Sequence, residues 1–516
     1  MISRRTLSVW FSLLLLAGPI PGSPPAGLYA QQSARTVDVA PSIDTAAHLA
    51  SLAAELDRLV NLPTERRDRT VGIRVVSLAT GQVWFDLHGN RPLTPASTTK
   101  LLTAYSSLVL FGPDYRIPTV LLADREVVEG EIRGNLYIRG HGDPLLKVAD
   151  IDRLADWLKS AGVTKIIGDV VGDGSYFDAT TERKDYSGEA DHVVDLPPVA
   201  GLSVEDNMVT VIVSSPRAGG EPCTVRTVPP SAGFTIVNSA KASGGGSRGG
   251  RRDVDNAGIS ISVSRGDAGG QVIRVSGTLG VNRTYSRTFE MEDPPTIVAG
   301  LLYERLGSRG ITVTGTVRGA RTPERATVLT QISRPITDVL DPVMKSSHNH
   351  YAEFLFKMIG GASSPEPGVN TAEEARDAVN RCLDACGASF DGCRMNDGSG
   401  LSRRNLIAPA TLVATLASAW RNPMVRSALY DAMSIAGVDG TLRKRMKGTP
   451  AFNNVRGKTG TLRNVSALCG YVTTADGEPL AFAMLMNGYN IGAYKNVQND
   501  VAVRLARFSF GRSTGS

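Results

Sequence analysis

The pattern of hydrophobic positions along the chain predicts a helix near residue 50, a β-hairpin after it, and helices again in the last third. Leucine and valine recur at helical spacing over 47–60, and helical patterning returns over 336–359. Two runs rich in β-branched and aromatic residues, 72–78 and 83–87, are joined by Ala79-Thr80-Gly81-Gln82, which predicts a hairpin. These strands would lead through a loop to a further helix that starts near Pro95.

The middle of the chain, from about residue 112 to 325, has a different character. Short β-like runs alternate there with Gly, Pro and Asp, and 151–160 predicts one helix. The basic, glycine-rich stretch 241–252 predicts a flexible surface loop. Because helical patterning lies on both sides of the middle segment, we predict that this segment is an insertion that splits one domain in two.

The first 30 residues have the organisation of an export signal, with Arg4 and Arg5 ahead of the short apolar run 9–17. This run is too short to span a bilayer, although the Pro/Gly-rich stretch after it leaves an uncleaved membrane anchor as the alternative. We expect a flexible leader over 31–46 and a mature, extracytoplasmic (for example periplasmic) protein without a membrane span. Whether export follows the general or the twin-arginine route stays open.

Composition indicates a large globular protein and argues against nucleic-acid binding. The 516 residues include 42% hydrophobic and 21% charged residues. A chain of this length exceeds what one hydrophobic core usually serves, so we expect about two to four domains. The formal net charge is +6, and removing Arg4 and Arg5 with the signal leaves +4. That surplus is too small to indicate a nucleic-acid partner.

The spacing of the cysteines and histidines indicates whether a disulfide or a metal site is to be expected. Cys382, Cys386 and Cys393 lie close enough in sequence for one disulfide in an exported protein, with the pairing undecided. A zinc site would need a fourth ligand, and no His or further Cys lies nearby in sequence. Cys469, within an apolar run, is expected to be a small buried hydrophobic residue. Because the histidines show no ligand spacing, we expect them to be surface or core residues.

The first candidate for chemistry is Ser97-Thr98-Thr99-Lys100, at the start of the predicted helix. Residues three apart share a helix face, so the Lys100 amine would lie beside the Ser97 hydroxyl. A serine hydroxyl needs an adjacent base to act as a nucleophile, and a lysine serves as that base only when its pKa is lowered. The motif also arises by chance, so it predicts a nucleophile only together with partners elsewhere.

Two further polar stretches supply such partners. Ser347-His348-Asn349 places a hydroxyl and an amide two residues apart, a spacing that can direct both into one cleft from a turn. Lys458-Thr459-Gly460 offers a cation, a hydroxyl for a carboxylate, and a glycine that a substrate backbone can approach closely. Either stretch alone is also compatible with an ordinary polar turn.

In this order, the three motifs resemble those of the penicillin-binding proteins and serine β-lactamases. The gap of 250 positions between Ser97 and Ser347 exceeds what a compact β-lactamase places there. The chain therefore resembles the low-molecular-mass class C penicillin-binding proteins, which are the D-alanyl-D-alanine carboxypeptidase/endopeptidases of the S13 peptidase family. Three further segments are similar to that family, namely 134–144, 396–403 and 436–442.

The resemblance implies an α/β (α+β) transpeptidase-like fold of the penicillin-binding-protein and β-lactamase type. Its antiparallel sheet would be flanked by helices and interrupted by two inserted, mostly β domains. The peptidase domain would comprise 47–118 and 326–516. Inserted domain II would comprise 119–196 and 291–325, and inserted domain III would comprise 197–290.

The resemblance also implies a role for each motif residue. Ser97 would attack the carbonyl between two terminal D-alanines of a peptidoglycan stem peptide, Lys100 would accept its proton, and Ser347 would pass a proton to the leaving amine. Asn349 would bind the substrate amide, and β-lactam antibiotics would be covalent inhibitors. No metal or other cofactor would be required. Lys458 and Thr459 would hold the terminal carboxylate of the substrate, and Gly460 would let the substrate backbone approach closely. The backbone N–H groups of Ser97 and Thr461 would form the oxyanion hole.

Some assignments remain open at this point. Asp173 resembles an acidic residue of the inserted part that approaches the free amine of the stem-peptide diamino acid, with a plain turn aspartate as the alternative. Asp397 and Ser399 are expected to stabilise a turn beside the cleft. A serine β-lactamase would share the three motifs but needs fast deacylation, for which no clear additional base is apparent. A non-catalytic peptidoglycan-binding scaffold would not need Lys100, Ser347 and Lys458 together.

Overall fold

The computed structural model describes residues 43–60, 70–189, 196–244, 258–362 and 372–510, which belong to one compact unit. The predicted signal and most of the predicted leader lie outside the described residues. Helix α1 (Ile43–Val60) begins four residues before the predicted start at residue 47, so the end of the predicted leader is helical instead. Its leucines at positions 52 and 56 are fully buried, which explains why tertiary packing stabilises this helix.

Strands from both ends of the chain form one sheet in the order β19-β20-β21-β22-β1-β2. The predicted hairpin is confirmed as β1 (Thr70–Ser77) and β2 (Val83–Leu87), which pair antiparallel. Because β22 pairs with β1 along its length, the first strands of the chain continue the sheet built by the last ones. The other strands are β19 (Ser434–Ile435), β20 (Arg456–Leu462), β21 (Val465–Thr473) and β22 (Pro479–Asn487).

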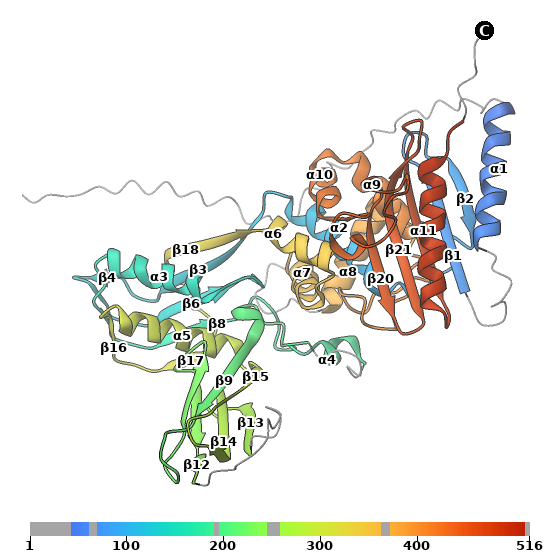
Figure 1. The fold of residues 1–516 in the computed structure, drawn as a ribbon. Helices are drawn as coiled ribbons and strands as arrows, with labels where there is room; N and C mark the ends of the chain where they lie inside the picture. The colour runs from blue at the N-terminus through green and yellow to red at the C-terminus, as the bar shows by residue number, and fades with distance from the viewer. Residues whose placement is uncertain (1–42, 61–69, 190–195, 245–257, 363–371, 511–516) are drawn as a thin grey trace, which may run out of the picture. The chain divides into compact units, whose positions relative to one another are not determined.

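Helices cover both faces of this sheet, so its central strands are hydrophobic along nearly their whole length (Figure 1). Successive residues of β21 point to opposite faces: Leu468 packs on the side of α1 and α11, whereas Cys469 packs on the side of α2. The layered arrangement confirms the predicted fold class. The bounds are α11 (Ile491–Arg507) on the first face, and α2 (Thr99–Phe111), α7 (Asn349–Gly361), α8 (Ala372–Ala385), α9 (Pro409–Arg421) and α10 (Pro423–Ala432) on the second.

The chain between α2 and α6 (Ile336–Asp341) forms further sheets, in line with the β-rich pattern of its sequence. One sheet has the order β17-β8-β6-β3-β18, and another has the order β16-β7-β5-β4. Helix α3 (Val148–Ser160) matches the helix predicted over 151–160, and α5 (Pro294–Ser308) packs beside it. The strands are β3 (Arg116–Ala123), β4 (Val127–Val128), β5 (Glu131–Ile132), β6 (Leu136–Gly140), β7 (Lys165–Ile166), β8 (Val170–Asp173), β16 (Thr312–Val313), β17 (Val317–Gly319) and β18 (Thr327–Pro335).

Two smaller sheets lie within 208–290, with the order β10-β9-β15 in one and β11-β14-β12 in the other, where β13 also pairs with β14. The prediction of a flexible loop over 241–252 is wrong for its first residues, because Lys241–Ser243 forms strand β12, which pairs with β14. Residues 245–252 lie outside the described part. The strands are β9 (Met208–Ser214), β10 (Thr224–Val228), β11 (Phe234–Asn238), β13 (Ile259–Arg265), β14 (Gln271–Gly280) and β15 (Thr284–Glu290).

Strand pairing connects residues on the two sides of the predicted domain boundaries. β3 begins at Arg116, before the boundary predicted at 118/119, and β18 lies after the boundary predicted at 325/326. The two strands pair antiparallel, and β3 also pairs with β6, so both belong to the same sheet as inserted strands. The division into a peptidase domain and two inserted domains stays a prediction.

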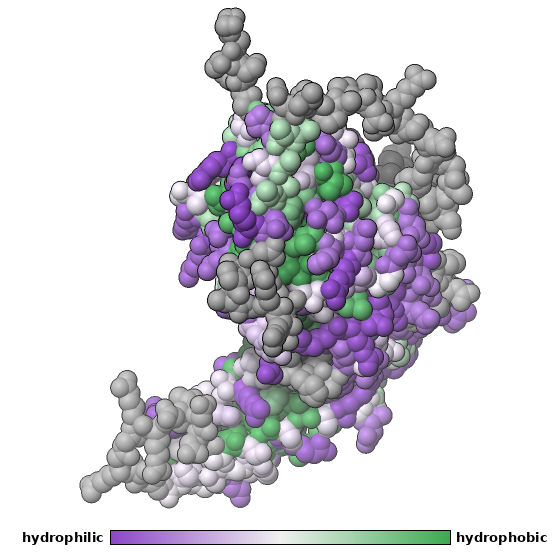
Figure 2. All heavy atoms as spheres, turned by 90° about the vertical axis from the view of Figure 1, so that its right-hand side faces the viewer, coloured by the Kyte–Doolittle hydropathy of each residue, from purple (hydrophilic) through white to green (hydrophobic). Residues whose placement is uncertain are grey.

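Figure 2 shows that hydrophilic residues predominate on the face that carries α1, with smaller hydrophobic patches among them. The large apolar side chains are instead concentrated inside, between the central sheet and its helices. Within the described ranges, no helix combines the length and the apolar character that a membrane crossing requires.

Candidate active site

Ser97 lies where the chain enters α2. A short 3₁₀ turn, η1 (Ala96–Thr98), precedes this helix, and the buried Ala96 adopts a φ of 49°, in the left-handed region. Surrounding structure must hold a non-glycine residue in this conformation, which is common at functional sites. The Ser97 hydroxyl accepts a hydrogen bond from Lys100 Nζ at 3.0 Å, as the three-residue spacing predicts.

The Lys100 amine is fully buried and makes two more hydrogen bonds. It donates to Asn349 Oδ1 at 2.8 Å and to the carbonyl oxygen of Ser399. Burial lowers the pKa of Lys100 to about 7, against the opposing influence of the Asp397 and Glu353 carboxylates. A substantial fraction of this amine is therefore neutral near pH 7, which is the form that accepts a proton from a serine hydroxyl.

Ser347 lies at a break in the predicted helical stretch 336–359. Helix α6 ends at Asp341, a π-type turn follows over Pro342–Ser346, and α7 begins at Asn349. Ser347 has a φ of 63°, so the chain turns sharply here. Its hydroxyl accepts a hydrogen bond from Lys458 Nζ at 2.8 Å, while Asn349 reaches Lys100. The break thus directs two side chains of one motif to two different lysines.

The third motif lies on β20. Lys458 is fully buried, and its pKa is well below the ordinary value because burial and the nearby Lys100 both oppose its charge. Thr459 donates a hydrogen bond from Oγ1 to Thr441 Oγ1 at 2.8 Å, at the exposed edge of the site. Thr441, which we did not predict as a site residue, belongs to the family-like segment 436–442. The strand therefore carries the Lys458 amine beside the Thr459 hydroxyl, and the Thr441 hydroxyl joins them from a 3₁₀ turn over Gly440–Leu442.

Gly460 allows β20 to pass close to the turn that carries the nucleophile. A Cβ atom at this position would lie 2.6 Å from the carbonyl oxygen of Pro95 and 3.0 Å from the Ser97 nitrogen. Only glycine permits this approach without moving the backbone. Thr461, the predicted second oxyanion donor, is the next residue of the strand and pairs with Ser466 of β21.

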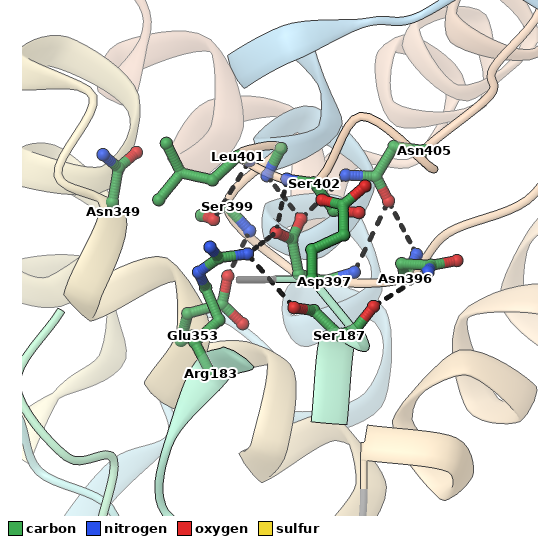
Figure 3. Close-up of polar contacts among 12 residues, drawn as sticks. Arg183, Ser187, Asn349, Glu353, Asn396, Asp397, Ser399, Leu401, Ser402 and Asn405 are labelled. Atoms are coloured by element: carbon green, nitrogen blue, oxygen red, sulfur yellow. Dashed lines mark hydrogen bonds and ion pairs between the residues drawn. The ribbon is translucent and has the colours of Figure 1, made fainter. Parts of the chain in front are cut away.

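A loop over 397–402 contacts Lys100 through a carbonyl oxygen. Two buried carboxylates hold this loop (Figure 3). Asp397 accepts N–H groups of this loop and Ser399 Oγ accepts the Leu401 N–H, as expected of turn residues. Ser399 also contributes the carbonyl oxygen that Lys100 contacts, which we did not predict. The second carboxylate belongs to Glu353, which we did not predict. Its position four residues after Asn349, on the same face of α7, was the available signal.

Asp173 is not brought to the three motifs. It lies at the end of β8, and its buried carboxylate accepts the N–H groups of Ser175 at 2.9 Å and Thr322 at 2.7 Å. It lines a separate hollow of about 620 Å³ together with Arg265 and Glu292, and no motif residue lines that hollow. These contacts favour the alternative of a turn-stabilising aspartate.

The predicted disulfide is absent, because Cys382, Cys386 and Cys393 are all free thiols. Their surroundings explain this: Cys386 Sγ donates to the Leu383 carbonyl, whereas Cys393 Sγ accepts the N–H of Ala408. Cys469 is buried in the sheet, as expected. Among the described residues, no three His, Cys, Asp or Glu side chains are arranged to hold a metal ion.

A buried lysine bonded to a serine hydroxyl, with a second serine–lysine pair beside it on the edge of a helix-flanked sheet, defines a serine peptidase of the penicillin-binding type. Residues 52–508 match the D-Ala-D-Ala carboxypeptidase 3 (S13) family, and the chain belongs to this family. The predicted family and enzyme class are confirmed.

Individual relatives agree with this assignment. The chain is 32% identical over 479 residues to a D-alanyl-D-alanine carboxypeptidase of Actinomadura sp., covering 90% of this chain and 86% of the relative. It is 27% identical over 426 residues to the D-alanyl-D-alanine carboxypeptidase DacB of Haemophilus influenzae, covering 82% and 86%. The crystal structure of penicillin binding protein 4 from H. influenzae superposes with a TM-score of 0.68 at 25% identity, covering 88% of this chain and 99% of the other.

Proposed function

We propose that the protein removes the terminal D-alanine from peptidoglycan stem peptides through an acyl-enzyme on Ser97. The contact of 3.0 Å between Lys100 Nζ and Ser97 Oγ carries the proposal, because it places a base of lowered pKa beside the hydroxyl. Two relatives at 32% and 27% identity are D-alanyl-D-alanine carboxypeptidases, which supports this substrate class.

Acylation would start with attack of Ser97 Oγ on the carbonyl carbon between the two D-alanines, while Lys100 Nζ takes the hydroxyl proton. The N–H groups of Ser97 and Thr461 would stabilise the oxyanion, a contribution of about 2.7–4 kcal/mol for one such donor. The C–N bond then breaks, and Ser347 Oγ passes a proton to the leaving amine while it receives the proton that Lys100 had taken, so Lys100 is neutral again. D-alanine departs, and the remaining peptide is an ester of Ser97.

Deacylation would return the enzyme to its starting state. Water attacks the ester carbonyl, its proton goes to Lys100, and the bond to Ser97 Oγ breaks with reprotonation of the hydroxyl. The product is a stem peptide shortened by one D-alanine. All of these steps use side chains and backbone N–H groups of this chain.

Substrate orientation would depend on β20 and α7. Lys458 and Thr459 would hold the terminal carboxylate. The Asn349 side chain would form a hydrogen bond with a peptide amide of the substrate. Cleavage of cross-links between D-alanine and a diamino acid would use the same attack with a different leaving amine, and we include this endopeptidase activity in the proposal.

Two further parts of the proposal concern inhibition and location. β-lactams would acylate Ser97 in place of the peptide; penicillin binding protein 4 of H. influenzae has been crystallised with a β-lactam. The organisation of residues 1–30 supports export to the periplasm or an equivalent extracytoplasmic space, where peptidoglycan is found.

Mass spectrometry after incubation with a labelled penicillin tests the proposal. We expect one adduct, carried by Ser97, and none in Ser97→Ala. Ser107→Ala is the matched control, because Ser107 lies in the same helix and its hydroxyl bonds only the Ala104 carbonyl. D-alanine release from a pentapeptide should follow the same pattern.

Full D-alanine release by Ser97→Ala would contradict the mechanism. Rapid turnover of nitrocefin, in place of a slowly hydrolysed penicillin adduct, would instead indicate a β-lactamase. A wild-type protein that binds peptidoglycan but is never acylated would indicate a scaffold.

A further inference from the structure

The short helix α4 (Arg183–Ser187) belongs to the inserted part of the chain, between β8 and β9, yet it contacts the 397–402 loop. Figure 3 shows Arg183 directed at Asp397 of this loop and Glu353 approaching the loop from α7, while Ser187 lies beside Arg183 and Asn396. Two side chains of α4 reach the two buried carboxylates of the site, and each carboxylate holds a different stretch of the loop.

Asp397 is the first of these carboxylates, and it is fully buried. Arg183, itself only 4% exposed, donates to its Oδ2 at 2.9 Å. The same carboxylate accepts the N–H groups of Gly400 and Ser402, both at 2.8 Å, and the Asn405 side chain at 2.7 Å. Arg183 therefore compensates a buried charge whose remaining lone pairs define the path of the loop.

Glu353 is the second carboxylate, and it is also fully buried. It accepts the N–H groups of Ser399 at 2.8 Å and Gly398 at 3.2 Å, and Tyr186 of α4 donates its hydroxyl at 3.1 Å. The peptide group that follows this anchored Ser399 nitrogen carries the carbonyl oxygen that accepts from Lys100 Nζ. One residue thus connects Glu353 to the lysine.

The loop also packs tightly against the nucleophile turn. A Cβ atom at Gly400 would lie 2.1 Å from the carbonyl oxygen of Ala96, and Thr103 donates to the Gly398 carbonyl at 2.8 Å. A displacement of the loop would therefore move both the acceptor of Lys100 and the backbone next to Ser97. Precise placement matters here, because a shift of about 1 Å can cost about a hundredfold in rate.

We propose that Glu353 and Arg183 are positioning residues for the reaction: through the 397–402 loop they hold the Ser399 carbonyl so that Lys100 points at Ser97. The inserted part of the chain thereby completes the catalytic centre. This inference rests on the proposed function of Ser97 and Lys100.

Glu353→Gln is the decisive variant, because it keeps the size of the side chain and removes its charge. The charged groups that act on Lys100 or respond to it are the Asp397 and Glu353 carboxylates, Lys458 and His348. Glu353 raises the pKa of Lys100 when it is ionised, and burial raises the pKa of Glu353 itself to about 7, so its charge acts on the amine at neutral pH and above. Its neutral replacement removes this effect and leaves the amine unprotonated to lower pH. We expect the acidic limb of the acylation rate to move to lower pH and the maximal rate to fall about tenfold.

Two other variants extend the test. Tyr186→Phe removes only the hydroxyl that supports the Glu353 carboxylate, and we expect the same direction of change with a smaller size. Arg183→Met should lower the acylation rate more than Arg183→Lys, because lysine retains a positive charge for Asp397. Lower kcat with nearly unchanged KM for a peptide substrate would accompany each loss of rate.

Gln498→Leu is the control for general destabilisation. Gln498 is fully buried, donates to Ser466 Oγ at 3.1 Å, and lies on α11, across the sheet from α2. We expect it to lower the unfolding temperature without moving the acidic limb. The full-length protein is used throughout, with penicillin acylation followed from pH 5 to 9 and the unfolding temperature recorded for each variant.

Different outcomes would contradict the proposed function and the positioning role of Glu353 and Arg183. Failure of penicillin to acylate the wild type would overturn the proposed function, and this inference with it. An acylated wild type, together with Glu353→Gln and Tyr186→Phe profiles that keep the wild-type limb, would overturn the inference alone. Should Glu353→Gln fail to fold, the Tyr186→Phe and Arg183→Lys profiles decide the question.

Discussion

Gly460→Ala tests how closely β20 must approach the nucleophile turn. The new Cβ would lie 2.6 Å from the Pro95 oxygen, 0.8 Å short of the 3.4 Å at which ordinary contact begins, and 3.0 Å from the Ser97 nitrogen. Both neighbours are backbone atoms, so neither can rotate away. Relief requires that the strand and the turn separate by several tenths of an ångström.

Such a separation affects stability and reactivity to different extents. Overpacking of this kind costs about 1–3 kcal/mol of unfolding free energy. It also moves the Ser97 N–H group away from the neighbouring strand, which would widen the proposed oxyanion hole. We expect the acylation rate to fall about tenfold to a hundredfold, more than the loss of stability alone would cause.

Stopped-flow acylation by a fluorescent penicillin, with thermal unfolding in parallel, measures both effects. Gly72→Ala is the control, because Gly72 lies on β1 of the same sheet. Its new Cβ would lie 2.8 Å from the Pro409 side chain, and no motif residue is among its nearest neighbours. We expect it to lower stability and leave acylation near the wild-type rate. Acylation of Gly460→Ala within about twofold of the wild type would refute the argument from close approach.

Three further expectations follow from the site. Ser347→Ala should slow acylation and leave Lys458 without its acceptor, whereas Ser346→Ala, whose hydroxyl bonds only a turn carbonyl, should stay near wild type in a penicillin assay. Thr441→Val removes the acceptor of the Thr459 hydroxyl, so KM for a peptide with a free carboxylate should rise, and an unchanged KM would argue against a role for this pair. Below pH 7 the acylation rate should fall about tenfold per pH unit, because protonation removes the base form of Lys100, whose pKa is about 7; a flat profile down to pH 5 would exclude it as the base.

The spacing of residues along the chain was sufficient to predict several local structures and contacts. The hairpin of β1 and β2 follows from two strand-forming runs and a short turn between them. The contact between Ser97 and Lys100 follows from three residues of separation at a helix start. Because such contacts depend on backbone geometry within one element, the sequence alone predicts them.

Other contacts depended on how distant elements pack. Ser347 meets Lys458 because the break between α6 and α7 faces a strand that is placed by the whole sheet. The disulfide prediction was wrong because the three nearby cysteines face different partners, which spacing does not reveal.

The sequence by itself therefore determined the family, the fold class, and the three motifs with their order. Only the tertiary structure showed that Asp173 accepts the N–H groups of Ser175 and Thr322, and that Arg183 and Glu353 bind the loop whose carbonyl oxygen Lys100 contacts. The physical reason is that a buried charge must find its partners in three dimensions, and Arg183 and Asp397, which form such a pair here, lie 214 positions apart in the chain.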